Sequence, residues 1–325
     1  MIIDSHAHLV APSAVYSNWA QMESAGLYNG HTRSAVTEGE LRQAADRQIA
    51  LMDEVGTDMQ LTSPRPYILK HSHRQPQLVK WWVADQNDAI AVQARYRPDR
   101  IRGVAGLPQV DGEPVDIVFG ELDRCINELG FVGVLLNPDP GEGNGRSPLM
   151  GDPYWYPLYE RLEAMDVPAL LHCAGCNGRE NYSEHFITEE SLAIYSLLRS
   201  DVFERFPGLK LIVPHGGGSV PYQLGRWVAH EGKFKGLPPA EARESYVSRL
   251  RHLWYDTCLY TPEALELLVR VVGSDRILFG TERPGSGYGL ENVKPMIDGL
   301  DILTDDDRAL IFEKNAIGLY QRLAG

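Results

Sequence analysis

Short apolar runs recur along the chain and are separated by segments with helical spacing. The runs cover residues 1–4, 59–62, 101–105, 132–136, 169–172, 211–213, 253–256 and 277–280. Within segment 40–55, helical spacing places these apolar residues on one face: Leu41, Ala44, Ala45, Ile49 and Met52. The same spacing predicts helices at 77–96, 114–129, 157–165, 188–206 and 262–272. Strands that alternate with helices are typical of parallel βαβ units.

Eight such units favour a closed (β/α)8 barrel, a TIM-like α/β fold, over a doubly wound open sheet. A barrel of this kind takes about 250 residues, and the chain has 325. None of the segments between the apolar runs has the composition of a linker. We therefore expect residues 1–325 to form a single domain.

Polar residues follow most of the apolar runs. They are His6 and His8 after the first run, Arg65 after the second, Asn137 after the fourth, His172 at the end of the fifth, His215 after the sixth, Asp256 at the end of the seventh and Glu282 after the eighth. In a barrel all strands end at one mouth, where active sites form. We therefore expect these histidines and carboxylates to converge from distant parts of the sequence.

The pair His6 and His8 has the spacing of a metal-binding motif. Residues two apart on a strand point the same way, about 6.6 Å apart along the strand, and imidazole is a common ligand of zinc. Two exposed loop histidines are the alternative. His172 ends an apolar run, which suits a ligand or catalytic residue but also a hydrogen-bonded core histidine.

His215 and Glu282 are the other candidates for chemistry. Three glycines follow His215, which lets the backbone approach a ligand closely or bind an anion at a helix start; a tight turn without a ligand is the alternative. Glu282 can ligate a metal or act as a base, or it can be a surface glutamate. Cys173 and Cys176 lack the second C-x-x-C pair of a zinc ribbon, so we expect no structural zinc there.

Composition limits the partners. The formal charge is -13 at pH 7, and the sequence contains no basic stripe. We therefore expect neither nucleic acid nor an anionic membrane surface as a partner. The apolar runs are shorter than the roughly 18 residues of a membrane span. The first residues lack a signal-peptide pattern, and four cysteines are too few for a disulfide scaffold. These features predict a cytoplasmic location.

The same positions resemble the amidohydrolase superfamily. The residues that carry this resemblance are Ile2-Ile3-Asp4 with His6 and His8, His172 at a strand end, His215 before three glycines, and Glu282. More narrowly, the chain is similar to the branch that contains aminocarboxymuconate semialdehyde decarboxylase, and within it to the 4-oxalomesaconate hydratases. The strings that carry this likeness lie at 56–61, 63–66, 104–110, 135–140, 154–159, 215–218 and 221–226, so it spans nearly the whole chain.

The resemblance implies one catalytic divalent metal ion, with zinc expected and manganese the alternative, and a homodimer. It implies that His6, His8 and His172 are metal ligands, that Glu282 ligates the metal or contacts its water, and that His215 is an acid–base group beside it. Most amidohydrolases carry aspartate at the position of Glu282, and glutamate there favours a hydratase over a decarboxylase. Arg283 stands where a small or thiol side chain is expected, and Cys173 replaces a small residue, so both changes put the substrate in doubt.

The activity implied is hydration of the conjugated C=C bond of an unsaturated oxo-polycarboxylic acid, with 4-oxalomesaconate as first candidate, in the degradation of aromatic acids. Glu282 serves as base and His215 as acid, and Arg65 holds the anionic substrate between two stiff prolines. Further substrate contacts are expected from Asn137, Tyr182, Ser183, His185, Arg226 and Arg283, with 181–185 in the loop after the fifth strand. The alternatives are a metal-dependent decarboxylase, a lactone or amide hydrolase, and a barrel without catalytic activity.

Overall fold

Eight parallel strands form the centre of the computed structural model, which describes residues 1–285 and 293–324. They are β1 (Ile3–His8), β2 (Met59–Ser63), β3 (Ile101–Gly106), β4 (Gly133–Leu136), β5 (Ala169–Leu171), β6 (Leu211–Val213), β7 (Trp254–Asp256) and β8 (Ile277–Leu278). Each strand pairs with the next one in the sequence. The eight predicted strands are therefore confirmed, in the order that a barrel requires.

Hydrogen bonds between β1 and the residues that follow β8 close the barrel. The N–H of Ser5 donates to the carbonyl of Phe279 at 2.8 Å, and the N–H of Glu282 donates to the carbonyl of His6 at 2.7 Å. A parallel bridge also joins Ala7 to Arg283. The closed barrel is thus confirmed, and the open sheet is excluded.

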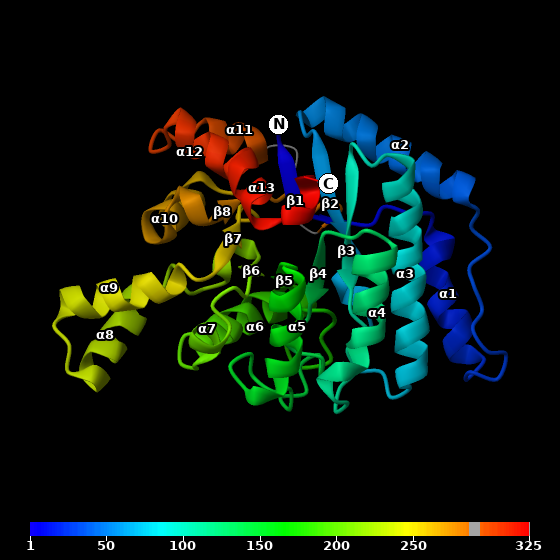
Figure 1. Cartoon of the computed structure of the whole chain (residues 1–325), viewed down its shortest axis with the longest axis horizontal. Coiled ribbons are helices and arrows are strands. Elements are labelled where there is room, and N and C mark those ends of the chain that lie inside the picture. Colours follow the sequence, from blue (N-terminus) through cyan, green and yellow to red (C-terminus); the bar gives the residue numbers. More distant parts are fainter. Residues whose placement is uncertain (286–292, 325) are drawn as a thin grey trace.

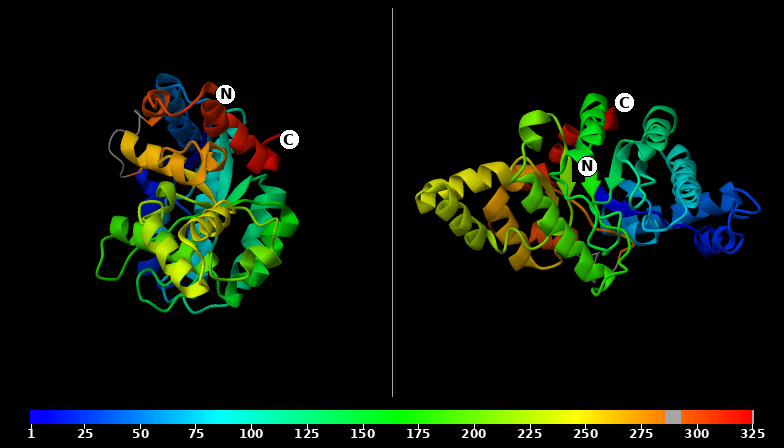
Figure 2. Two further views of the ribbon diagram at one scale, coloured as in Figure 1. Left: turned by 90° about the vertical axis from the view of Figure 1, so that its left-hand side faces the viewer. Right: turned by 90° about the horizontal axis from the view of Figure 1, so that it is seen from below.

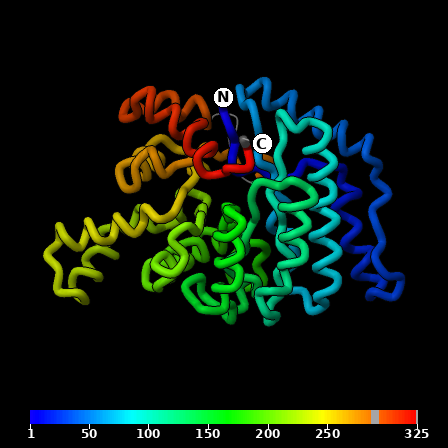
Figure 3. Tube along the Cα trace, viewed as in Figure 1, coloured from blue at the N-terminus to red at the C-terminus, as the bar shows by residue number. Residues whose placement is uncertain are grey.

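Helices surround the strands (Figures 1 and 2). They are α1 (Ser13–Ser24), α2 (Glu38–Val55), α3 (Pro76–Tyr96), α4 (Phe119–Asp123), α5 (Tyr156–Met165), α6 (Tyr182–Leu197), α7 (Val202–Arg205), α8 (Leu224–Lys235), α9 (Pro239–Leu250), α10 (Pro262–Val272), α11 (Val293–Asp298), α12 (Asp305–Ala309) and α13 (Asn315–Leu319). The hairpin of α8 and α9 projects from one side, and the two chain ends lie near each other (Figure 3). Among the residues described, no helix has both the length and the apolar character that a membrane span needs.

Two helix predictions need correction. The segment 188–206 is not one helix, because α6 ends at Leu197 and the short α7 follows. The segment 181–185 was expected in a loop, but α6 begins at Tyr182. The side chain of Asn181 accepts hydrogen bonds from the N–H groups of Ser183 and Glu184, and Glu184 bonds back to Asn181. This capping box satisfies backbone donors and starts the helix early.

The apolar strand residues divide into two layers. One buried cluster contains Ile3, Leu61, Val104, Leu135, Leu170, Ile212 and Leu278, one from each strand except β7. Their strand neighbours belong to a second cluster that also contains helix residues such as Leu158 and Leu268. Because successive strand residues point to opposite faces, the strand members of the first cluster point into the barrel, and the second cluster packs the outer face of the strands against the helices. The first cluster also continues to Val79 and Val83 of α3 and to Ala316 and Leu319 of α13. This rigid core holds the strand ends in place.

Candidate metal centre and substrate cavity

Three buried histidines meet at the mouth of the barrel. The ring centroids of His6 and His8 lie 5.0 Å apart, those of His6 and His172 lie 5.1 Å apart, and those of His8 and His172 lie 5.4 Å apart. Within the described part of the chain, the Nε2 atoms of all three lack a hydrogen-bond partner. An unsatisfied buried nitrogen is costly unless a ligand completes it. Ligand atoms of His6 and His172 lie within 4.8 Å of one another in a group with His215, and those of His8 and His172 in a group with Glu282, so the rings form a candidate metal site centred on His172.

A β-bulge helps to aim the first two histidines. In the pairing of β1 with β2, Asp4 faces Gln60 and Ala7 faces Thr62, so β1 has one extra residue between these two pairs. Bulges of this kind redirect side chains next to active sites. His6 and His8 follow the start of this irregularity, which places both at the mouth.

The other ring nitrogen of each histidine has a fixed partner. Nδ1 of His6 lies 2.6 Å from Oδ2 of Asp256, and Nδ1 of His8 lies 2.9 Å from the hydroxyl oxygen of Ser63. Nδ1 of His172 donates to the carbonyl of Cys173 at 2.9 Å. Such partners orient a ligating imidazole and set which nitrogen faces the metal. Nε2 is the free donor atom in all three rings.

Glu282 completes the set of donors. One carboxylate oxygen of Glu282 and one nitrogen each of His8 and His172 lie within 4.8 Å of one another. Burial raises the pKa of Glu282, but the hydrogen bond and charge of His215 outweigh it and hold the pKa well below its usual range. Burial also holds the pKa values of His8 and His172 well below the ordinary value. Neutral imidazoles with a carboxylate suit zinc or manganese, so the residues fit the expected metal ion.

His215 lies beside this donor set and is held by two glutamates. Its Nδ1 is 2.8 Å from Oε1 of Glu190, and its Nε2 is 3.5 Å from Oε1 of Glu282. Burial opposes protonation of His215, but the charges and hydrogen bonds of Glu190 and Glu282 raise its pKa well above the ordinary value. His215 is therefore placed and charged to donate a proton.

Both acid–base candidates have left-handed backbone conformations. The φ angle is 48° at His215 and 59° at Glu282, a region that costs energy for residues other than glycine. The turn after His215 continues with φ of 62° at Gly216 and 84° at Gly217. A Cβ atom on Gly217 would lie 2.7 Å from the ring of Tyr255. The glycines thus permit a sharp turn that keeps His215 at the barrel mouth.

A cavity of about 410 Å³ opens onto the donor set. Its lining residues are His8, Arg65, Pro66, Tyr67, Tyr182, Phe186, Glu282, Pro284 and Gly285. Arg65 is fixed there, because its Nε donates to the carbonyl of Leu9 at 3.2 Å and its guanidinium lies 4.8 Å from the centre of the Tyr16 ring. The cavity combines a cation, aromatic walls and the metal-facing residues.

The structure brings only some of the expected substrate contacts to this cavity. Arg65 and Tyr182 line it, whereas the other five lie elsewhere. Asn137 is buried against Gln109 and His71, and His185 pairs with Asp139. Ser183 lies in the exposed first turn of α6, and Arg226 is exposed on α8. Arg283 borders a small hollow beside Asp4 and Gln48.

Two residues of the site were missed from the sequence, and a third was expected at the mouth without a role. Asp256, which ends the seventh apolar run, is the third, and the structure places it against Nδ1 of His6. Tyr260 donates its hydroxyl hydrogen to Oε2 of Glu282 at 2.7 Å. Glu190 lies in the middle of α6, where a glutamate carries no local signal. Only the tertiary packing of α6 against the turn at His215 shows its role.

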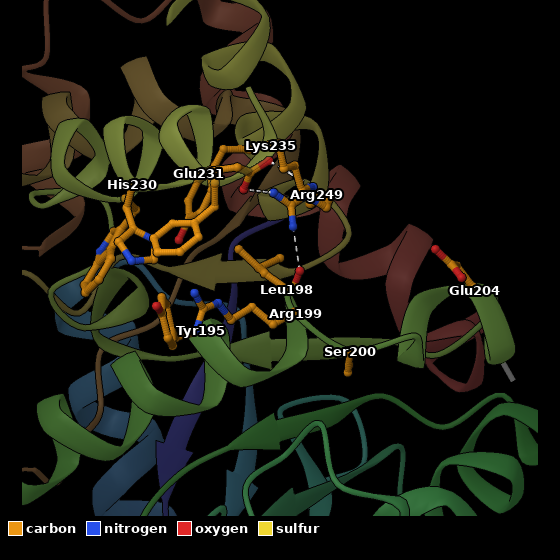
Figure 4. Close-up of a pocket in the computed structure, with 12 residues that line it drawn as sticks. Tyr195, Leu198, Arg199, Ser200, Glu204, His230, Glu231, Lys235 and Arg249 are labelled. Atoms are coloured by element: carbon orange, nitrogen blue, oxygen red, sulfur yellow. Dashed lines mark hydrogen bonds and ion pairs between the residues drawn. The ribbon is translucent and has the colours of Figure 1, made fainter. Parts of the chain in front are cut away.

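A second, larger hollow lies away from the metal centre (Figure 4). It measures about 550 Å³ and lies between α6, α8 and α9. Arg249 crosses it, pairs with Glu231 and donates to the carbonyl of Leu198 at 2.6 Å. Its lining contains none of the histidines of the metal centre. The hollow is therefore separate from the candidate active site.

Comparison with known proteins agrees with this geometry. The amidohydrolase family profile matches residues 3–322. The chain is 33% identical to 2-keto-4-carboxy-3-hexenedioate hydratase from Sphingobium sp. strain SYK-6, over 99% of this chain and 97% of the relative. It is 30% identical to a gamma-resorcylate decarboxylase from Polaromonas sp., over 85% of this chain and 87% of that protein.

Solved structures show the same fold. The crystal structure of 4-oxalomesaconate hydratase from Rhodopseudomonas palustris superposes with a TM-score of 0.86 and 31% identity, over 100% of this chain and 97% of that chain. A dihydroxybenzoic acid decarboxylase from Polaromonas sp. JS666 has a TM-score of 0.73 and 23% identity, over 98% and 96% of the two chains, and was solved with bound manganese. The fold, the match along the sequence and the converging histidines lead to one conclusion: this chain belongs to the amidohydrolase family.

Proposed function

We propose that residues 1–325 act as one metal-dependent hydratase. The reaction adds water to the conjugated C=C bond of an unsaturated oxo-polycarboxylic acid, and 4-oxalomesaconate is the first candidate. The observation that carries the proposal is the position of Glu282, which faces His8 and His172 and lines the same cavity as Arg65. The 33% identity to a hydratase over nearly the whole chain supports this chemistry.

His6, His8, His172 and Glu282 would hold the metal ion, with zinc expected and manganese the alternative. When bound, a divalent ion supplies Lewis acidity, which activates water for attack at neutral pH. The chain prepares the site for it through Asp256, Ser63 and the carbonyl of Cys173, which fix the three rings. The roles of the residues below are the same for either ion.

Glu282 would accept the proton of the attacking water. Its carboxylate is ionised, because His215 outweighs the effect of burial on its pKa. Tyr260 holds Oε2 through a hydrogen bond of 2.7 Å, which leaves Oε1 directed toward His215. A positioned base of this kind contributes about 100-fold or more to a rate.

His215 would donate a proton to the substrate carbon next to the attacked one. Attack by water pushes negative charge onto the conjugated oxo-acid, and the protonated imidazole neutralises it. Glu190 keeps the ring charged from the side that faces away from Glu282. Protonation at carbon then completes the addition of one water molecule.

Arg65 would bind a substrate carboxylate in the cavity that it lines together with His8 and Glu282. Its guanidinium offers paired donors to a carboxylate, and its contacts with Leu9 and Tyr16 hold it in place before substrate arrives. Tyr182 lines the same cavity. In a partly enclosed cavity this positive charge outweighs the acidic exterior, because field lines concentrate there.

An absorbance assay tests the proposal. The purified protein, loaded with zinc or manganese, is mixed with 4-oxalomesaconate while the absorption of its conjugated double bond is followed. We expect a steady loss of absorption that stops when a chelator removes the metal and returns when the metal is restored. Unchanged absorption with the fully loaded protein would contradict the proposal.

Decarboxylation is the second candidate, because a gamma-resorcylate decarboxylase is 30% identical to this chain. The same protein sample is therefore incubated with 2,6-dihydroxybenzoate, and carbon dioxide is measured. Sustained release there, without turnover of 4-oxalomesaconate, would favour this candidate. Hydrolysis of lactones, the homodimer and the cytoplasmic location stay predictions; sedimentation of the purified protein tests the dimer.

A further inference from the structure

Helix α6 presents two different pairs of residues to its surroundings. Phe186 packs against His172, with ring centroids 4.8 Å apart, and Glu190 contacts His215. One position earlier in each case, His185 and Glu189 face Asp139, which follows β4. Residues four apart share one side of a helix. The helix therefore links the candidate active site to a second group of polar side chains.

The second group has the geometry of a metal site. One donor atom each of Asp139, His185 and Glu189 lies within 4.8 Å of the other two. His185 is only 2% exposed. Its Nε2 lies 3.0 Å from Oδ2 of Asp139. Burial opposes protonation of His185, but the contact with Asp139 raises its pKa, so the two form an ion pair that a metal ion would replace. Two ligands of one tetrahedral zinc ion lie about 3.3 Å apart, from bond lengths of about 2.0–2.1 Å.

A comparison within the molecule singles out His185. In the described part of the chain, buried Nε2 atoms without a hydrogen-bond partner belong to His6, His8, His71, His172 and His185. Three of these form the candidate metal centre. His71 belongs to none of the groups of possible metal ligands, whereas His185 belongs to two. His185 differs from the first centre because its Nε2 faces a carboxylate, and its group combines one buried imidazole with two carboxylates, a donor set that suits a divalent cation.

Hydrogen bonds from surrounding residues fix the carboxylate of Asp139. Oδ2 of Asp139 accepts the N–H of Gly143 at 2.6 Å, and its Oδ1 accepts the hydroxyl of Ser147. Burial and the charge of Asp139 raise the pKa of Glu189 to about 7, as expected for two acids that share a site. A bound cation would relieve this repulsion and release the proton of Glu189.

We propose that Asp139, His185 and Glu189 bind a second divalent metal ion of the zinc type, separate from the catalytic ion. Three protein ligands leave the fourth position of a tetrahedral zinc ion to water. The bound ion would tie α6 to the connection after β4 and so hold Glu190 beside His215. Cys176 and Glu180 flank the site, because each has a donor atom within 4.8 Å of a ring nitrogen of His185.

Metal stoichiometry tests this site without any measurement of activity. Metal-free full-length protein is titrated with Zn²⁺, and the bound metal is counted by equilibrium dialysis and elemental analysis. We expect two equivalents per chain in the wild type. His185→Gln removes the imidazole and Glu189→Gln removes the charge of the carboxylate. Either variant should bind one equivalent of Zn²⁺ per chain, because the affinity of the second site falls at least about 10-fold.

Matched variants separate the two sites. His172→Ala should also leave one equivalent, but here the remaining ion should be lost when Glu189→Gln is added. His71→Gln removes a buried imidazole with the same unsatisfied Nε2 and should still bind two. Circular dichroism confirms that each variant is folded, and Glu189→Gln, at a partly exposed position, keeps the test usable if His185→Gln does not fold.

One equivalent in the wild type would overturn the proposal, as would two equivalents in folded Glu189→Gln. Loss of the second ion in Cys176→Ser, with retention in Glu189→Gln, would overturn the assigned ligands. Because metal is counted rather than turnover, this result is independent of whether the protein is a hydratase.

Discussion

Oε1 of Glu190 lies 2.8 Å from Nδ1 of His215, and both side chains are buried. The pair joins the middle of α6 to the turn after β6. Since Glu190 helps to raise the pKa of His215, it keeps the proposed acid protonated over a wider range of pH. In the proposed reaction we therefore expect this pair to set the alkaline limit.

Glu190→Gln should shift that limit to lower pH. An acid is active only while protonated, so the rate falls as pH rises through its pKa. Removing the carboxylate lowers the pKa of His215, and the alkaline limb of kcat should move down by about one to three units. Glu160→Gln, which removes a carboxylate from the exposed surface of α5, serves as the control and should leave the limb in place. Identical limbs for wild type and Glu190→Gln would show that His215 is not the acid.

His172→Ala should remove the catalytic metal and the activity together. The ring supplies one of three convergent Nε2 atoms, and neither His6 nor His8 can fill its place from β1. Elemental analysis and the 4-oxalomesaconate assay on the same sample make the measurement. A variant with full metal content and full turnover would show that the centre lies elsewhere.

Glu282→Gln should keep much of the metal but lose at least about 100-fold in kcat, the scale of general-base catalysis. Tyr260→Phe removes only the hydrogen bond to Oε2 and should cost about 10-fold or less. The ratio of the two effects separates loss of the base from loss of its orientation. Near-normal kcat in Glu282→Gln would exclude Glu282 as the base.

Arg65→Ala should raise KM roughly 10- to 100-fold, because a hydrogen bond to a charged group contributes about 1.5–3 kcal/mol. Arg226→Ala removes the same charge from the exposed surface of α8 and should leave KM unchanged. Steady-state kinetics of the two variants make the comparison. An equal rise of KM in both would point to long-range attraction rather than to binding by Arg65.

The fold was predictable because the buried strands of a barrel are visible in the sequence as short apolar runs. Polar residues follow most of these runs, so His6, His8, His172 and Glu282 could be expected to meet at the mouth. The topology alone brings these strand ends together. The start of α6 at Tyr182 was missed although the capping pair Asn181 and Glu184 is visible in the sequence.

The remaining differences arise from tertiary packing. Arg226 follows the turn at His215 in sequence, but α8 leads away from the barrel in a projecting hairpin. Asn137 ends β4 but turns toward His71 and Gln109. Glu190 reaches the site because α6 packs against His172 and His215 through Phe186 and Glu190. Local sequence patterns do not determine the tertiary positions of such helices and side chains.

The mass of the product formed from 4-oxalomesaconate tests the central claim most directly. The metal-loaded protein is incubated with this acid in water enriched in ¹⁸O, and the product is analysed by mass spectrometry. The account predicts a product heavier than the substrate by one water molecule, with the heavy oxygen incorporated, and the same reaction absent in His172→Ala. A product lighter by carbon dioxide, or recovered substrate alone, would contradict it.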